Sequence, residues 1–206
     1  MSCIWVLFYS VLLLRRCVWC KLTLVDFVMY PVTGNSEVDE KSKRMAESYD
    51  IPIVLSLPTN VTATPGTKVL QSCFAVMASK GIPGLLAESG QFGIYDQKKS
   101  AVHLKGLKNL LHVVGILDEE PTMTNKQHHI KYRSSMRSPL NGLWYPAKSV
   151  GEIVKEGEYI GKITDYFGET IFEVIAPADA QIVAMRNSLY INMGHAMYYL
   201  AEVWDK

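Results

Sequence analysis

The sequence lacks an excess of charge of either sign, and this excludes functions that depend on a strong electrostatic field. Its 206 residues contain 21 lysines and arginines and 20 aspartates and glutamates, so the formal net charge is +1. The basic residues do not gather with aromatic residues along any segment, as they do in proteins that bind nucleic acid. We therefore expect no nucleic-acid partner and no attraction to an acidic membrane surface.

A long apolar run is also missing. The strongest candidate, Ile4–Leu14, is shorter than the roughly 20 residues that cross a bilayer as a helix. Arg15 and Arg16 follow this run, whereas the positive charge of a signal peptide precedes its apolar stretch. Residues 1–25 are therefore an atypical apolar segment. A membrane anchor is its less favoured interpretation, behind a buried strand or helix or a start unrelated to the following domain.

Cysteines are few, and only two of the four have a suggestive spacing. Cys17 and Cys20 form a CxxC pair, but no second pair accompanies them and no βαβ pattern precedes them. Buried thiols are the better interpretation of this pair, and Cys73, inside a helical pattern, is expected in the core. This usage indicates a reducing compartment and predicts a cytoplasmic location.

Residues 26–120 alternate between helical and extended patterns, which is typical of an α/β domain. The predicted elements are a helix from the cap at Asn35 through about Tyr49, a strand at Ile51–Leu55, a helix at Thr67–Lys80, a strand that ends at Glu88, and a helix from Lys98 to about Leu117. Strand, helix and strand between residues 51 and 88 predict a βαβ unit with a parallel strand pair. His103 is isolated, and His112 is expected on the polar face of the last helix.

Glu88 ends the otherwise apolar run that begins at Gly81, and Ser89 and Gly90 follow it. This pattern predicts a buried strand that delivers an acid to its carboxyl end, the edge at which open α/β sheets bind ligands. Such a residue is either a general base or a structural carboxylate with satisfied hydrogen bonds. The local pattern alone favours the structural interpretation.

The pattern changes after residues 118–127, a polar segment that contains a proline and makes the best domain boundary. Residues 128–206 consist of short alternating runs separated by glycines. This spacing predicts a small all-β barrel or sandwich.

Three parts of the chain resemble the succinylglutamate desuccinylase/aspartoacylase family: Ser79–Gly90, Leu107–Leu117 and the glycine-rich tail. The resemblance extends from about Asp26 to Val203. It implies an α/β fold with an incomplete zinc carboxypeptidase-like domain at residues 26–120 and a small all-β barrel-sandwich domain at residues 128–206.

The tail also resembles the biotinyl/lipoyl barrel, with one half-motif at Val150–Ile163 and the other at Ile175–Ala180 with Gly194. Ala180 stands where glycine is usual. A carrier domain needs a lysine in the hairpin between the halves, and Thr164–Glu169 contains none. A swinging-arm role is therefore not expected.

The family resemblance implies zinc-dependent hydrolysis of an N-acyl amino acid or a related small acyl amide. In such a reaction zinc polarises the carbonyl and lowers the pKa of its water, and a glutamate accepts the proton of that water. Glu88 matches this glutamate. The resemblance therefore shifts the interpretation of Glu88 to a general base.

The zinc ligands that the resemblance implies are not recognisable. The family has a His and a Glu three residues apart and a later His, all upstream of the glutamate. The five histidines of this chain all follow Glu88, and none has a Glu three residues later. Asp26–Phe27 falls near the later ligand segment but holds no histidine. No substrate-binding residue is identified, since Arg133 and Arg137 are better explained as linker or strand-edge arginines.

Two interpretations follow. The chain is the C-terminal portion of a zinc-dependent deacylase, with Glu88 as its general base, no zinc of its own and no activity alone. The alternative is a non-catalytic interaction module that forms homo-oligomers or pairs with an intact family member. The acyl group and amine of a substrate are not encoded in the recognisable segments.

Overall fold

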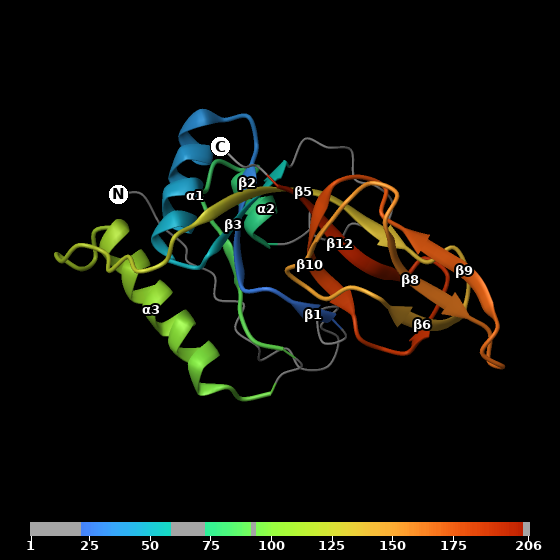
Figure 1. The fold of residues 1–206 in the computed structure, drawn as a ribbon. Helices are drawn as coiled ribbons and strands as arrows, with labels where there is room; N and C mark the ends of the chain where they lie inside the picture. The colour runs from blue at the N-terminus through green and yellow to red at the C-terminus, as the bar shows by residue number, and fades with distance from the viewer. Residues whose placement is uncertain (1–21, 59–72, 92–93, 204–206) are drawn as a thin grey trace. The chain divides into compact units, whose positions relative to one another are not determined.

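The computed structural model describes residues 22–58, 73–91 and 94–203 (Figure 1). These residues form two compact units. The first, called the α/β unit below, consists of residues 26–58, 73–90 and 95–130. The second, called the β unit, consists of residues 22–25, 91, 94 and 131–203. The fold is of the mixed α/β class that the sequence predicts.

The sheet of the α/β unit is built around β2, which pairs with a strand on each side. Its strands are β2 (Phe27–Val32), β3 (Ile53–Pro58) and β4 (Leu86–Glu88). β3 runs parallel to β2, and β4 runs antiparallel to it along the other edge. Strand β5 (His128–Arg137) begins beside β3, where the His128 amide donates to the Pro52 carbonyl over 2.8 Å.

The parallel pair is not the one expected from the sequence. The strands at Ile51–Leu55 and at Glu88 are expected to run parallel to each other, and this expectation is wrong. β2 pairs with both, and the helix that connects parallel strands is α1, between β2 and β3. The error arises from β2, a mostly buried run that contains Pro31 and was not predicted as a strand.

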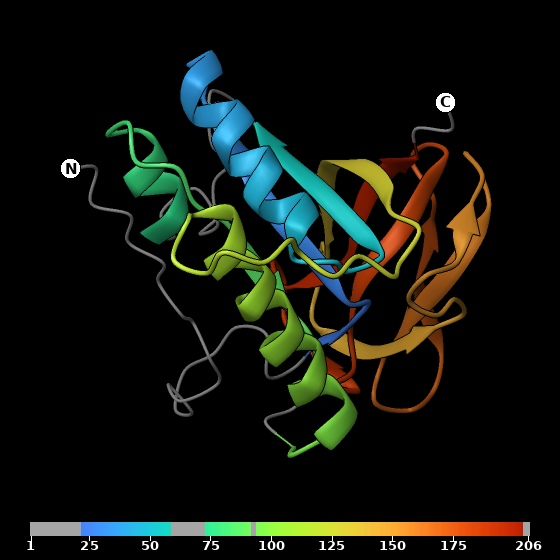
Figure 2. The same ribbon diagram turned by 90° about the vertical axis from the view of Figure 1, so that its left-hand side faces the viewer.

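Helix α1 (Ser36–Ser48) follows its sequence pattern closely. The Asn35 side chain caps it by accepting a hydrogen bond from the Val38 amide, as predicted. Helix α3 (Gln97–Val113) lies beside it (Figure 2). Together with β2 and β3 they enclose one core, which consists of Val28, Met45, Ala46, Tyr49, Ile51, Val54 and Leu110.

The other two predicted helix boundaries are only partly matched. The described part of the helix predicted at Thr67–Lys80 is α2 (Cys73–Ala78), and residues 67–72 lie outside the described residues. Cys73 is exposed at the first position of α2, so its expected place in the core is wrong. Helix α3 ends at Val113, before the predicted Leu117. It ends there because Gly115 has a φ of +75° and the Ile116 amide bonds back to the Leu111 carbonyl.

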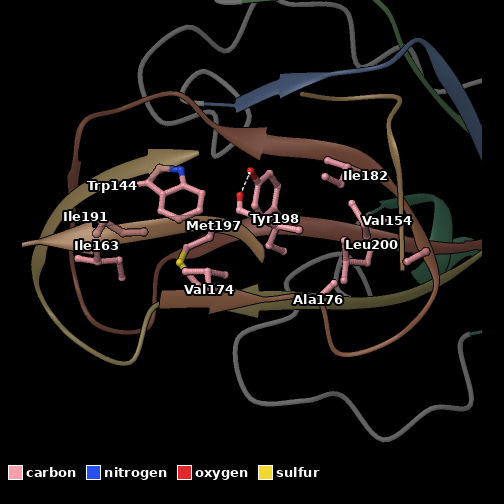
Figure 3. Packing of buried hydrophobic residues seen from close by; sticks show 12 residues of the cluster. Trp144, Val154, Ile163, Val174, Ala176, Ile182, Ile191, Met197, Tyr198 and Leu200 are labelled. Carbon is pink, nitrogen blue, oxygen red and sulfur yellow. Dashed lines mark hydrogen bonds between the residues drawn. The ribbon is translucent and has the colours of Figure 1, made fainter. Parts of the chain in front are cut away.

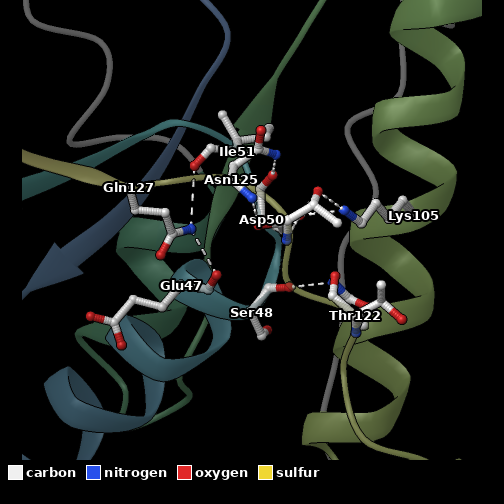
Figure 4. Close-up of polar contacts among 10 residues, drawn as sticks. Glu47, Ser48, Asp50, Ile51, Lys105, Thr122, Asn125 and Gln127 are labelled. Atoms are coloured by element: carbon white, nitrogen blue, oxygen red, sulfur yellow. Dashed lines mark hydrogen bonds and ion pairs between the residues drawn. The ribbon is translucent and has the colours of Figure 1, made fainter.

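Residues 122–127, expected to belong to a linker, are fastened to the end of α1 through Asp50 (Figure 4). The Asp50 carboxylate accepts hydrogen bonds from the backbone amides of Thr124 and Asn125, both over 3.0 Å, and from the Lys105 ammonium. The Gln127 amide nitrogen donates to the Glu47 carbonyl over 2.8 Å. Asp50 has a φ of +59°, which an aspartate tolerates better than most residues. We call this set of bonds the Asp50 clasp.

The β unit contains two groups of antiparallel strands. One group is β1 (Leu22–Leu24), β7 (Ile153–Val154), β10 (Ala180–Arg186) and β12 (Ala196–Val203), with β10 paired to each of the others. The other is a sheet of β11 (Tyr190–Ile191), β6 (Gly142–Pro146), β8 (Tyr159–Thr164) and β9 (Thr170–Ile175), in that order. The prediction of short strands with glycine turns is confirmed, although the sequence did not reveal β5, β10 and β11.

One apolar core holds the β unit together (Figure 3). The rings of Trp144 and Tyr198 meet edge to face, with their centroids 5.3 Å apart. The Tyr198 hydroxyl donates to the Ile160 carbonyl over 2.8 Å, so this buried polar group is satisfied. The remaining side chains of this core are Val154, Ile160, Ile163, Val174, Ala176, Ala180, Ile182, Ile191, Met197 and Leu200.

Only the end of the apolar segment predicted at residues 1–25 can be located. Leu22–Leu24 forms β1 and pairs with β10 in the β unit. Residues 1–21, with Cys3, Cys17 and Cys20, lie outside the described residues. In the described ranges, no helix has the length and apolar character needed to cross a membrane.

Candidate functional site

Glu88 is the last residue of β4, as the sequence predicts, but it lies at a different edge of the sheet from the one expected. In the ladder between β4 and β2, Glu88 is opposite Phe27, the first residue of β2. Phe27 is in turn opposite Ile53, the first residue of β3. Because β4 is antiparallel to both strands, its carboxyl end lies at their amino ends. The expected position at the carboxyl edge of a parallel pair is therefore wrong.

The Glu88 carboxyl is a partly buried acid that has no compensating partner among the described residues. In the described part of the chain, burial is the only influence on the protonation of this carboxyl, and the residue is only partly exposed. Burial raises its pKa from 4.5 to about 7. Near neutral pH the group is thus divided between its protonated and ionised forms, so it can both accept and return a proton.

The residue after Glu88 connects it to helix α3. The Ser89 carbonyl oxygen lies 3.4 Å from Nε2 of His103, and Nδ1 of the same ring lies 3.0 Å from the Tyr49 hydroxyl. The Ser89 hydroxyl oxygen is buried and has no hydrogen-bond partner in the described part of the chain. His103 thus has polar contacts to Tyr49 and Ser89, although no potential metal-ligand group of three side chains includes it in the described residues.

An ion pair flanks the same region. Lys99, one turn before His103 on α3, donates to the Asp26 carboxylate over 2.6 Å. Asp26 immediately precedes Phe27, the residue opposite Glu88, and a Cβ added at Gly90 would lie 3.6 Å from the Cβ of Lys99. The sequence contains one signal of this arrangement. Lys99, His103 and Gly106 follow each other at intervals of four and three, and so they share one face of α3.

His112 is not the surface histidine expected from its place beside Lys105 and Lys108. Its side chain is only 3% exposed, and its Nδ1 has no partner in the described residues. The chain turns back after Gly115, and Thr122 exchanges hydrogen bonds with the Asn109 side chain. The helical spacing of apolar residues does not reveal that the residues after Gly115 return along α3.

Among the other candidate residues, Arg137 and His195 have structural contacts. Nη1 of Arg137 donates to the Gly194 carbonyl over 2.8 Å, in agreement with a strand-edge arginine. The side chain of Arg133 is not among those described. His128 and His129 begin β5, and Nδ1 of His195 lies 3.3 Å from the Asn192 amide within the β unit.

The donors in the described residues do not fit a zinc ion. No group of three His, Cys, Asp or Glu side chains is found within those residues. Near Glu88, Asp26 is engaged by the Lys99 ammonium, and both nitrogens of His103 already face Tyr49 and Ser89. A catalytic zinc site requires three protein ligands and an open position.

No family model and no curated protein matches this sequence. Solved structures do share its fold. One is a succinylglutamate desuccinylase/aspartoacylase from Rhodobacter sphaeroides, with a TM-score of 0.74 and 18% identity over 90% of this chain and 56% of that one. Another is a product-bound ectoine utilization protein from Ruegeria pomeroyi, with a TM-score of 0.73 and 17% identity over 87% and 54% of the two chains.

An aspartoacylase family protein from Mesorhizobium loti has a TM-score of 0.66 and 16% identity, over 91% of this chain and 55% of that one. The resemblance inferred from the sequence is thus confirmed as a shared fold. The chain spans slightly more than half the length of these structures.

Proposed function

We propose that this chain carries the proton-transferring glutamate of a deacylase-type hydrolase, and that Glu88 is this residue. The observation that carries the proposal is a partly buried carboxyl at a strand end, without an ionic partner in the described residues and with a pKa of about 7. A general base works best when its pKa lies near the operating pH, because it must accept a proton and release it in one cycle. The shared fold with desuccinylase and aspartoacylase structures supports the reaction class.

The proposed substrate is an N-acyl amino acid or a related small acyl amide. In its hydrolysis, Glu88 would accept a proton from the attacking water and return it to the nitrogen of the leaving amine. Zinc, where this reaction class uses it, polarises the acyl carbonyl and activates the water. Because the described donors do not fit zinc, we derive no zinc-dependent step for this chain. We propose that the chain alone does not hydrolyse the substrate.

The domain organisation belongs to the same proposal. Residues 26–120 would correspond to part of a zinc carboxypeptidase-like domain, and residues 128–206 to a barrel-sandwich domain. The two strand groups around the core that contains Trp144 and Tyr198 support the second assignment. The hairpin between β8 and β9 has no lysine, which argues against a carrier function.

The test uses the full chain. Its zinc content is measured by elemental analysis, and short-chain N-acyl amino acids are assayed with and without added zinc. We expect less than stoichiometric zinc and no turnover, with the Glu88 carboxyl titrating near pH 7 by NMR. If the chain holds stoichiometric zinc and turns over a substrate, the proposal that it is inactive alone is refuted. If Glu88→Gln then abolishes this turnover, the proposal that Glu88 is the general base stands. A Glu88 that titrates near its ordinary pKa would remove the observation on which the proposal rests.

A second candidate is a non-catalytic module that pairs with another copy of itself, and one observation favours it. Strand β9 is the edge of its sheet and exposes Ile171, Phe172 and Ile175. Exposed apolar edge strands readily pair with another chain. Light scattering on the same preparation decides this point: a dimer that Ile171→Lys dissociates would support the module, and a folded monomer would exclude self-pairing.

A further inference from the structure

His103 makes two polar contacts through opposite sides of its ring, and together they define its tautomer. The Ser89 carbonyl can only accept a hydrogen bond, so Nε2 of His103 must carry the proton that points to it over 3.4 Å. In the neutral ring Nδ1 is then an acceptor, and it receives the proton of the Tyr49 hydroxyl over 3.0 Å. The two bonds form a continuous chain from the end of α1 to the residue after Glu88.

Tyr49 is held in place by its packing against α3. Its ring is buried and lies directly over Gly106, where an added Cβ would be 2.3 Å from two of the ring carbons. Only a glycine at this position permits the approach. The Tyr49 ring and the His103 ring meet nearly edge to face, with centroids 6.1 Å apart. Packing therefore fixes the hydroxyl that orients His103.

Burial also keeps the Tyr49 hydroxyl protonated. It raises the pKa of Tyr49 above its ordinary value, so the group remains a donor throughout the physiological range. The same hydroxyl lies 3.5 Å from the His103 carbonyl, a weaker alternative acceptor. The bond from Nε2 to Ser89 is long, and its strength depends on the ring orientation that Tyr49 sets.

We infer that His103 is a positioning residue: oriented by Tyr49, it holds the Ser89 carbonyl and thereby keeps Glu88 at the end of β4 in its partly buried position. The role as a positioning residue for catalysis rests on the function proposed for Glu88. The structural claim, that His103 controls the surroundings of Glu88, is independent of that proposed function. A merely structural histidine would contribute to stability without changing the protonation of Glu88.

Two substitutions separate the two bonds of His103. In His103→Gln the amide nitrogen reaches the place of Nε2, so the bond to Ser89 is retained. In His103→Asn the shorter amide can accept from Tyr49 at the place of Nδ1 but cannot reach Ser89. Tyr49→Phe removes only the orienting hydroxyl and keeps the ring over Gly106. His129→Ala, at a partly exposed histidine of β5, is the matched control.

The readout is the Glu88 carboxyl titration by NMR in the full chain labelled with carboxyl-¹³C glutamate, with Glu88→Gln for assignment. We expect His103→Asn to admit water and lower the Glu88 pKa by about one unit or more, and Tyr49→Phe to lower it less. His103→Gln and His129→Ala should keep the wild-type value. The Ser89 and Gly90 amide shifts should change in the same order.

Equal behaviour of His103→Gln and His103→Asn, or an unchanged Glu88 pKa in Tyr49→Phe and His103→Asn, would overturn the inference. The function proposed for Glu88 would then stand, because its raised pKa would be intact. If instead wild-type Glu88 titrates near its ordinary value, the proposed function loses its support. The Ser89 and Gly90 amide shifts would still decide whether His103 holds this turn.

Discussion

Replacing Glu88 by glutamine should make the protein more stable at pH 8 than the wild type. A raised pKa means that the folded chain binds the Glu88 proton more tightly than the unfolded chain does. The resulting stabilisation is fully present below the unfolded pKa of about 4.5 and is lost as the pH rises through about 7. At a pH above about 7 the folded wild type carries a poorly solvated negative charge on Glu88. Glutamine has nearly the same shape and no charge at any pH.

The size of the effect follows from the two pKa values. Each tenfold change in proton affinity corresponds to about 1.4 kcal/mol, so a rise from 4.5 to about 7 corresponds to about 3 kcal/mol. Partial exposure of the side chain screens part of this energy, and we expect about 2–3 kcal/mol. At pH 5 the two free energies of unfolding should differ by less than about 1 kcal/mol, because only the unfolded Glu88 is largely ionised at that pH.

Urea unfolding between pH 5 and 8.5, followed by circular dichroism at 222 nm, measures this difference. The described helices all belong to the α/β unit, so their signal reports the unit that contains Glu88. Titrations of other groups cancel in the difference between the two proteins. Glu40→Gln, at an exposed position of α1, is the control and should show no such pH dependence. Parallel stability profiles of the wild type and Glu88→Gln would refute the reasoning.

Two further substitutions test the packing around the site. Asp50→Ala should lower the free energy of unfolding by about 3 kcal/mol, because the Thr124 and Asn125 amides lose a buried acceptor. Although burial alone would raise the pKa of Asp50, the Lys105 ammonium and these amides hold it below its ordinary value. Its contribution is therefore present above about pH 4 and lost as the pH falls through the lower folded pKa, so acid unfolding of Asp50→Ala should show a weaker pH dependence. Gly106→Ala should destabilise the protein by about 1–3 kcal/mol, since the new methyl group would enter the Tyr49 ring. A gain of about 1 kcal/mol, the usual effect of this change in a helix, would contradict the packing of Tyr49 on Gly106.

The sequence predicted those features of the fold that depend on residues close together in the chain. Helix α1 has its cap at Asn35 and an apolar face at helical spacing, and both are local properties. Glu88 was located at a strand end because an apolar run ends there. The strand pairing was missed, because the partner of β4 is β2, far away in the sequence. The contact between Ser89 and His103 was missed for the same reason: it depends on which face of α3 meets β4.

The β unit shows the same division. Its glycine turns and short strands were visible in the sequence because each is a local pattern. Strand β10, which joins β1, β7 and β12, was not visible as a strand, since its residues are nearly all apolar or small and mostly buried, without a clear alternation. The buried position of His112 also escaped prediction, because the residues after Gly115 return along α3.

The Asp50 clasp has a consequence for dissecting this protein. The polar composition of residues 118–127 suggests a cut at about residue 120 to isolate the first half of the chain. A polypeptide that ends there would lose the amides of Thr124 and Asn125 and the side chain of Gln127, and it would leave the buried Asp50 carboxylate facing Lys105 alone. The smallest piece that keeps α1 and α3 joined as they are here therefore extends through Gln127. Residues 122–127 have the composition of a flexible linker, but their hydrogen bonds hold α1 and α3 together. An insertion or a protease cleavage site should therefore be placed outside this segment.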